Sequence, residues 1–154
     1  GWNYTWQSRL DKEPRLIPKI VIKRSIMSTI LCIEDDNFIA DMYVHSLKKA
    51  GYQVDVVPNG IDALAKAKQT VYDVILLDLM LPGKSGVEIL ESLRGEDGSG
   101  LPHTKIIVTT NFDEPAEDRA RLEKLADGYL IKADVIPSKL VELVGQILTE
   151  TDKS

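Results

Sequence analysis

Short apolar runs alternate with amphipathic stretches from residue 29 onward. Each run is short and is bounded by polar or turn-forming positions, which is typical of a strand. The predicted strands lie at 29–33, 53–57, 73–78, 105–110 and 129–132. The stretches between them carry apolar residues at helical spacing. They predict helices at about 37–50, 60–69, 85–94 and 115–125, and a last helix from Pro137. Pro115 and Pro137 both suit the first position of a helix.

Strands and helices that alternate in this way indicate a parallel sheet covered by helices on both faces. The first, third and fourth strands are the most apolar, so we expect them at the centre of the sheet. The second and fifth strands have the character of edges. The strand order 2-1-3-4-5 satisfies these positions. We therefore predict an α/β fold with a doubly wound, five-stranded parallel sheet.

Two of the central strands end in carboxylates. Glu34 and Asp35 follow the first strand, and Asp78 ends the third strand shortly before a break at Pro82-Gly83. The predicted order brings these strand ends together at the edge where open α/β sheets bind ligands. Neighbouring carboxylates repel one another unless a cation lies between them. A hard divalent ion such as Mg²⁺ suits this set of oxygen ligands.

The composition is that of one ordinary domain. The chain has 154 residues, which is enough to bury a single core. No apolar stretch approaches the length of a membrane span. The single cysteine, Cys32, cannot form an internal disulfide and lies in an apolar strand. We therefore expect a cytoplasmic protein without a membrane partner.

The charge of the chain changes near Met27. Residues 1–26 hold six Lys/Arg and two Asp/Glu, a net charge of +4, whereas residues 27–154 hold 13 and 22, a net charge of −9. We interpret residues 1–26 as a basic extension that comes either from sequence added for expression or from translation upstream of the natural start. The alternative is a docking arm for an acidic partner or a membrane surface. We expect the domain to span 27–150 and a short tail to follow at 151–154.

The residues at the strand ends match a known pattern. The stretch from about 28 to 150 resembles the receiver domain of two-component response regulators, which has a flavodoxin-like fold. Four segments carry the resemblance, and although none is specific by itself, their order and spacing together are specific. The matching segments are Ile33-Glu34-Asp35-Asp36, Asp78-Leu79-Met80-Leu81-Pro82-Gly83, Thr110 and Tyr129-Leu130-Ile131-Lys132.

The resemblance implies a role for each matching residue. Asp78 would accept a phosphoryl group. Glu34 and Asp35 would hold Mg²⁺ together with Asp78 and the main-chain carbonyl of Met80. Lys132 would place its positive charge on a phosphoryl oxygen. Transfer between anionic groups depends mostly on charge neutralisation and positioning, so these residue types suit the chemistry.

Two further residues would form a switch. The hydroxyl of Thr110 would bond the phosphoryl group, and Tyr129 would then turn inward and change the face made by the fourth helix, fifth strand and fifth helix. Taken alone, Thr110 would be an ordinary strand residue, Lys132 a solvated lysine and Tyr129 a half-buried edge residue. Asp36 lies one position beyond the acidic pair, and we expect it at the helix N-terminus or on the surface.

The function implied by the resemblance is that of a phosphoacceptor rather than an enzyme. The phosphoryl donor would be a histidine kinase or a histidine phosphotransfer protein. Because the predicted elements end near residue 150, we expect a single-domain regulator that signals by altered binding to a downstream target protein. We expect no nucleic-acid partner. A dimer that forms on phosphorylation is a further expected assembly.

Three other classes of protein fit less well. Gly83-Lys84-Ser85 resembles the end of a P-loop, but that motif requires glycine at the position of Asp78. A haloacid-dehalogenase-like phosphatase has a second aspartate two residues after its nucleophile, where Met80 stands here. A degenerate receiver that only binds partners would not need the full set of acids with Lys132.

Several positions depart from the family pattern. Asn111 stands where a small residue is usual, and Ala133 replaces the usual proline after Lys132. We expect a trans Lys132–Ala133 peptide, because a non-proline cis bond costs about 2.5–4 kcal/mol. Met80 and Phe112 occupy positions that influence the lifetime of the phosphoryl group. Their bulk should hinder an attacking water, so we expect slow self-dephosphorylation.

Overall fold

The computed structural model describes residues 28–95, 100–111, 115–134 and 136–152. The predicted extension at 1–26 and the side chain of Phe112 lie outside these residues. The described strands are β1 (Thr29–Ile33), β2 (Gln53–Val57), β3 (Val74–Asp78), β4 (Lys105–Thr110) and β5 (Gly128–Ile131). The described helices are α3 (Asn37–Lys49), α4 (Gly60–Gln69), α5 (Gly86–Arg94), α6 (Ala116–Leu125) and α7 (Pro137–Asp152), with a short 3-10 helix, η1, at Lys132–Asp134.

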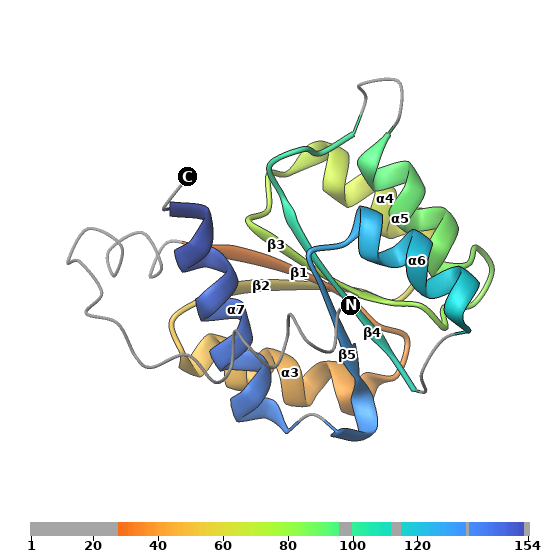
Figure 1. Ribbon diagram of the computed structural model, residues 1–154. Coiled ribbons are helices and arrows are strands. Elements are labelled where there is room, and N and C mark those ends of the chain that lie inside the picture. Colours follow the sequence, from red (N-terminus) through yellow and green to blue (C-terminus); the bar gives the residue numbers. More distant parts are fainter. Residues whose placement is uncertain (1–27, 96–99, 112–114, 135, 153–154) are drawn as a thin grey trace.

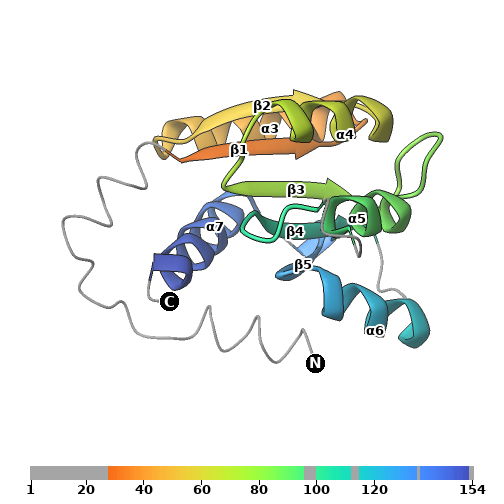
Figure 2. The same cartoon turned by 90° about the horizontal axis from the view of Figure 1, so that it is seen from above.

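The strands form one parallel sheet in the order β2-β1-β3-β4-β5. Helices α3 and α7 lie together on one face, and α4, α5 and α6 cover the other (Figure 1). The view from above shows the arrows of β1, β2 and β3 pointing the same way (Figure 2). The predicted α/β class, doubly wound flavodoxin-like fold and strand order are therefore confirmed.

Burial explains why the strands take this order. Strands β1, β3 and β4 are buried along almost their whole length, whereas three of the five residues of β2 are exposed. A strand covered on both faces must be apolar throughout, and an edge strand need not be. In the register of β1 and β3, Ile33 pairs with Leu77. Glu34 and Asp78 therefore follow at the same edge, which we call the carboxyl edge.

Several predicted boundaries differ from the observed ones by one residue, including the start of α6 and the end of β5. Pro115 does not start α6 but precedes it, because its ψ of 150° is extended rather than helical. The last strand covers Gly128–Ile131, and Lys132 instead begins η1. Lys132 still lies at the carboxyl edge, directly after the strand. Pro137 starts α7 and the Lys132–Ala133 peptide is trans, as predicted.

Within the described residues, no helix combines the length and the apolar character needed to cross a lipid bilayer.

Candidate functional site

Asp78 lies at the centre of the carboxyl edge, as the last residue of β3. Its side chain is only 1% exposed. The main-chain N–H of Met80 donates to its Oδ1 at 2.9 Å. The turn that follows places Gly83 at a φ of +83°, a conformation that glycine adopts without strain. The main chain directly after β3 thus holds one of the two carboxylate oxygens of Asp78.

Glu34 and Asp35 bring two more carboxylates to Asp78 from the end of β1. Glu34 is buried and Asp35 is exposed. One carboxylate oxygen from each of the three residues lies within 4.8 Å of the others. The structure therefore brings together the three predicted acidic residues. The contact that the structure gives for Met80 is that of its main-chain N–H, which donates to Asp78. The role of its carbonyl oxygen as a metal ligand stays a prediction.

Lys132 reaches these acids from the start of η1. Its Nζ lies 2.5 Å from Oε1 of Glu34 and 3.0 Å from Oδ2 of Asp78. Burial alone would lower the pKa of Lys132, but its hydrogen bonds and charge attraction to both acids outweigh that effect and raise the pKa. Lys132 therefore stays positively charged at neutral pH, between the two most buried carboxylates of the site.

The site carries more negative charge than Lys132 neutralises. The pKa of Glu34 is raised to about 7, with burial as the largest cause. The hydrogen bond with Lys132 lowers this pKa, whereas the nearby Asp78 raises it. A bound cation would favour the ionised carboxylate. The oxygen donors and this surplus charge both fit Mg²⁺.

Gly86 is a site residue that sequence analysis missed. It begins α5, and a Cβ at this position would lie 2.4 Å from Cα of Leu79 and 2.9 Å from the carbonyl oxygen of Asp78. Ser85 caps the helix by accepting from the N–H of Glu88. The helix can approach the end of β3 only because position 86 has no side chain. A glycine after a serine cap was the available signal, but it is too common to be read alone.

Thr110 and Tyr129 lie beside the site on neighbouring strands. Thr110 ends β4 and is fully buried, and it pairs with Ile131 in β5. Tyr129 is also buried rather than half-buried, and the guanidinium carbon of Arg119 in α6 lies 5.6 Å from the centroid of its ring. Contacts with α6 thus give this edge-strand tyrosine more cover than its sequence position indicated. The proposed switch role of both residues stays a prediction.

Asp36 and Cys32 have structural roles near the acids. Oδ1 of Asp36 accepts from the N–H groups of Phe38 and Ile39 and so caps α3. This agrees with its predicted place at a helix N-terminus. Cys32 is buried in β1, and burial together with the charge of Glu34 raises the pKa of its thiol to about 12. It behaves as a small apolar residue, as predicted.

Comparison with known proteins gives a consistent result. A model of the response regulator receiver domain family matches residues 30–145. Sensory transduction protein RegX3 of Mycolicibacterium smegmatis is 36% identical over 121 residues, which are 79% of this chain and 49% of that protein. Transcriptional regulatory protein PcoR of Escherichia coli is 37% identical over 123 residues, or 80% and 51%. The chain thus spans about half the length of these curated relatives.

The fold comparison agrees with the sequence comparison. The crystal structure of a CheY-like response regulator receiver domain protein from Methanospirillum hungatei JF-1 matches with a TM-score of 0.75 at 29% identity. The match covers 82% of this chain and 98% of that one.

Proposed function

The chain belongs to the response regulator receiver domain family, and from this premise we propose that Asp78 accepts a phosphoryl group in a Mg²⁺-dependent reaction. The observation that carries the proposal is the position of Lys132, whose Nζ contacts both Glu34 and Asp78. The proposed acceptor, the acids proposed to hold the metal and a buried lysine thus meet at the carboxyl edge. In the proposed reaction an Asp78 oxygen attacks phosphorus and forms a P–O bond. The P–N bond of a phosphohistidine breaks, and the leaving imidazole takes up a proton.

Each side chain has a defined task in this reaction. Glu34, Asp35 and Asp78 would hold Mg²⁺, with the carbonyl of Met80 as a further ligand. When bound, the ion supplies positive charge that offsets the anionic group and its anionic acceptor. The N–H of Met80 already holds Oδ1 of Asp78. Lys132 lies on the Oδ2 side, where it can pass from the carboxylates to a phosphoryl oxygen.

Exposed apolar side chains at the same edge support docking of a protein donor. Phe38 is 74% exposed, Met80 50% and Ile136 59%. They belong to the first turn of α3, the β3–α5 loop and the residue before α7, which all follow strand ends. Large apolar groups in water around a reactive site suit a partner that covers them. We infer that the phosphoryl donor, a histidine kinase or a histidine phosphotransfer protein, binds here.

The proposed output is a change in protein–protein affinity. The face made by α6, β5 and α7 would bind a downstream protein, or a second copy of this chain, differently after phosphorylation. We propose that Thr110, which ends β4, bonds the phosphoryl group, and that this bond would supply the free-energy difference between the two states. We propose a cytoplasmic phosphoacceptor whose receiver domain acts through protein partners, without direct contact to nucleic acid and without a separate substrate of its own.

A labelling experiment tests the proposed site. The protein is incubated with a small phosphodonor and Mg²⁺, and the phosphorylated fraction is measured by intact mass. Wild type should give an acid-stable, base-labile phosphoprotein, whereas Asp78→Asn should give none. Asp36→Asn is the matched control, because asparagine keeps the helix cap and the substitution changes a neighbouring acid only. Equal labelling of Asp78→Asn, or labelling unaffected by a chelator, would refute the assignment.

A further inference from the structure

Both carboxylate oxygens of Glu34 have partners in the structure. Its Oε1 lies 2.5 Å from Nζ of Lys132, and its Oε2 accepts from the main-chain N–H of Asp36 at 3.2 Å. The main-chain N–H of Glu34 donates to the carbonyl of Val57 at 3.1 Å, directly after the paired residues of β1 and β2. The place of the Glu34 carboxylate thus depends on Lys132 on one side and on the main chain of Asp36 on the other.

The side chain of Asp36 fixes the main chain that makes this contact. Asp36 is the N-cap of α3 and has an extended backbone, with a φ of −82° and a ψ of 109°. Its Oδ1 accepts from the N–H groups of Phe38 and Ile39 at 2.9 and 3.1 Å. Its carbonyl accepts from the N–H of Ala40 at 2.9 Å. The residue that starts the helix therefore also directs an N–H group at Glu34.

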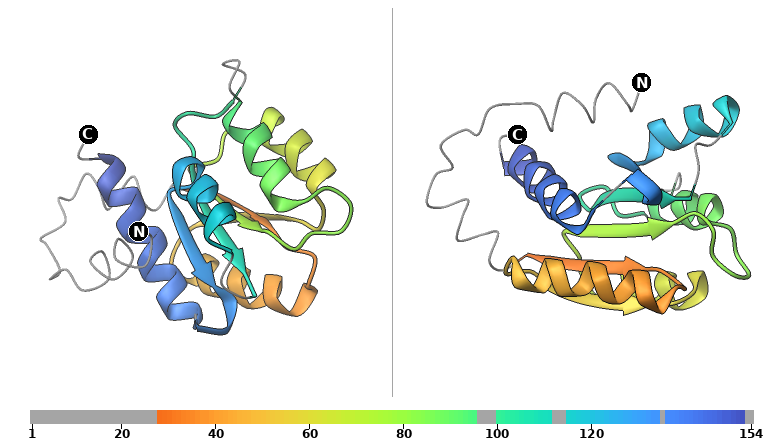
Figure 3. Two further views of the ribbon diagram at one scale, coloured as in Figure 1. Left: turned by 45° about the vertical axis from the view of Figure 1, so that its right-hand side comes forward. Right: turned by 90° about the horizontal axis from the view of Figure 1, so that it is seen from below.

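Helix α3 gives this contact a firm base. Its residues Ala40, Tyr43 and Leu47 are buried in the core. The helix lies along β1 and β2 and beside α7 (Figure 3). The cap thus joins the Glu34 carboxylate to an element whose position is set by core packing and not by the acidic site.

We propose that Asp36 is a positioning residue that holds the Glu34 carboxylate in the geometry that binds Mg²⁺. It does so as an acceptor for the N–H groups of α3 and not through its charge, because the residue is exposed and water screens a charge there. This inference rests on the proposed function, whose metal-binding acids it concerns. Without the cap, the first turn of α3 loses an acceptor for its N–H groups. The N–H of Asp36 is then no longer held toward Glu34, which keeps only its contact with Lys132.

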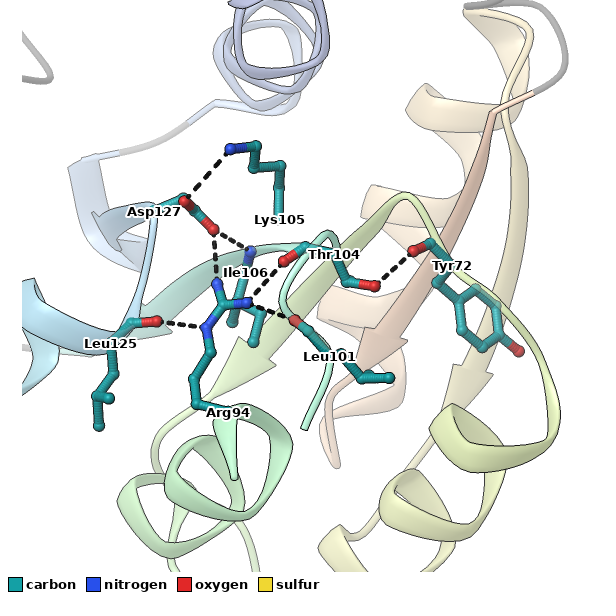
Figure 4. Close-up of polar contacts among 8 residues, drawn as sticks. All are labelled: Tyr72, Arg94, Leu101, Thr104, Lys105, Ile106, Leu125 and Asp127. Atoms are coloured by element: carbon teal, nitrogen blue, oxygen red, sulfur yellow. Dashed lines mark hydrogen bonds and ion pairs between the residues drawn. The ribbon is translucent and has the colours of Figure 1, made fainter. Parts of the chain in front are cut away.

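An aspartate at the opposite edge of the sheet, where the strands begin, provides a contrast (Figure 4). Oδ2 of Asp127 accepts from the N–H of Ile106 at 2.9 Å and also pairs with Nη2 of Arg94 at 2.7 Å. Its Oδ1 lies 3.7 Å from Nζ of Lys105. Arg94, at the end of α5, donates to three main-chain carbonyls as well.

The two aspartates therefore differ in what their side chains supply. Asp127 supplies charge to two cations, whereas the described side-chain contacts of Asp36 are with main-chain N–H groups. Asparagine is as good an N-cap as aspartate but carries no charge. It should therefore replace Asp36 without loss of the cap, and it should fail to replace Asp127.

Binding of Mg²⁺ alone, followed by amide shifts in NMR spectra of the full chain, tests this role without a phosphodonor. Asp36→Ala removes the cap, and Asp36→Asn keeps the cap while removing the charge. Asn59→Ala is the matched control, because Oδ1 of Asn59 caps α4 by accepting from the N–H of Asp62 at 2.8 Å. The described hydrogen bonds of the Asn59 side chain are with Asp62, so its loss leaves the contacts of Glu34 in place.

Asp36→Ala should bind Mg²⁺ about tenfold more weakly than wild type, since partners that orient a metal ligand are typically worth about 10–100-fold in affinity. Asp36→Asn should bind Mg²⁺ nearly as tightly as wild type does. Asn59→Ala should lower the melting temperature about as much as Asp36→Ala and leave the Mg²⁺ affinity unchanged. Asp127→Asn should also lower the melting temperature without changing the Mg²⁺ affinity. Loss of stability alone then cannot explain the effect at position 36.

Three results would overturn the positioning role and leave the phosphoryl site intact. They are wild-type Mg²⁺ affinity in Asp36→Ala, an equal loss of affinity in Asp36→Asn, and an equal loss in Asn59→Ala. If Asp36→Ala does not fold, Asp36→Gly replaces it, because glycine is tolerated at an N-cap but offers no side-chain acceptor. If Mg²⁺ shifts no amides around Asp78 in wild type, the Mg²⁺ site of the proposed function fails, and the positioning role fails with it.

Discussion

Replacing Lys132 with methionine would remove the cation that lies between two buried carboxylates. The Lys132 side chain is 8% exposed, and those of Glu34 and Asp78 are 2% and 1% exposed. Unit charges about 3 Å apart attract by roughly 5 kcal/mol at an effective dielectric constant of about 20. Desolvation of the ions offsets much of this attraction. Breaking a buried pair by removing one partner nevertheless costs about 3–5 kcal/mol.

The expected loss lies at the lower end of that range. Glu34 can take up a proton when its cation is gone, because its pKa is already raised to about 7. We therefore expect Lys132→Met to lower the free energy of unfolding by about 3 kcal/mol at neutral pH without Mg²⁺. For a chain of this length the melting temperature should fall by about 10 °C. Mg²⁺ should restore part of the loss, because it supplies positive charge to the same carboxylates.

Urea unfolding with and without Mg²⁺ measures both effects. Lys139→Met is the control, because Lys139 is exposed in the first turn of α7 and has no described partner among the acids of the site. The reasoning is refuted if Lys132→Met loses no more stability than the control. It is also refuted if Mg²⁺ stabilises wild type and Lys132→Met by the same amount.

Gly86→Ala should lower the free energy of unfolding by about 1–3 kcal/mol, because its Cβ would lie 2.4 Å from the backbone of Leu79. Gly145→Ala is the control and should cause no such loss, because the nearest atom to its Cβ is 3.7 Å away. Equal losses for the two variants in thermal unfolding would contradict the account. Without Mg²⁺, stability should fall as pH rises from about 4.5 to about 7, because folded Glu34 holds its proton to a higher pH than the unfolded chain. Urea titrations in which Glu34→Gln keeps the same slope would contradict this. Iodoacetamide should barely modify folded Cys32 at pH 9, since the pKa of its thiol is raised to about 12; mass spectrometry that finds rapid modification of the folded protein would show the thiol to be accessible.

The sequence contained enough to predict the sheet and its acidic edge. Burial on both faces forces a strand to be apolar throughout, so the patterns of β1, β3 and β4 placed them at the centre. Once that order was set, the acids after β1 and at the end of β3 had to meet. Lys132 was identified through the family resemblance, because a lysine after an edge strand has no distinctive pattern of its own.

Other features depend on contacts that leave no local pattern. Arg94 bonds carbonyls of residues 7 and 31 positions away, and a carbonyl acceptor places no demand on the residue that carries it. The need for glycine at position 86 arises from the approach of α5 to β3, which only the folded chain defines. The boundary at Pro115 was wrong because the φ of proline suits the first helical position, whereas its ψ, which the proline ring does not fix, is extended here at 150°.

Locating the phosphoryl group tests the central claim most directly. The protein is phosphorylated with a small phosphodonor and Mg²⁺ and then treated with borohydride, which reduces an acyl phosphate to an alcohol. Peptide mass spectrometry identifies the reduced residue. We expect the aspartate at position 78 to be converted to homoserine, and Glu34 and Asp35 to remain unchanged. Reduction at another carboxylate, with none at Asp78, would contradict the account.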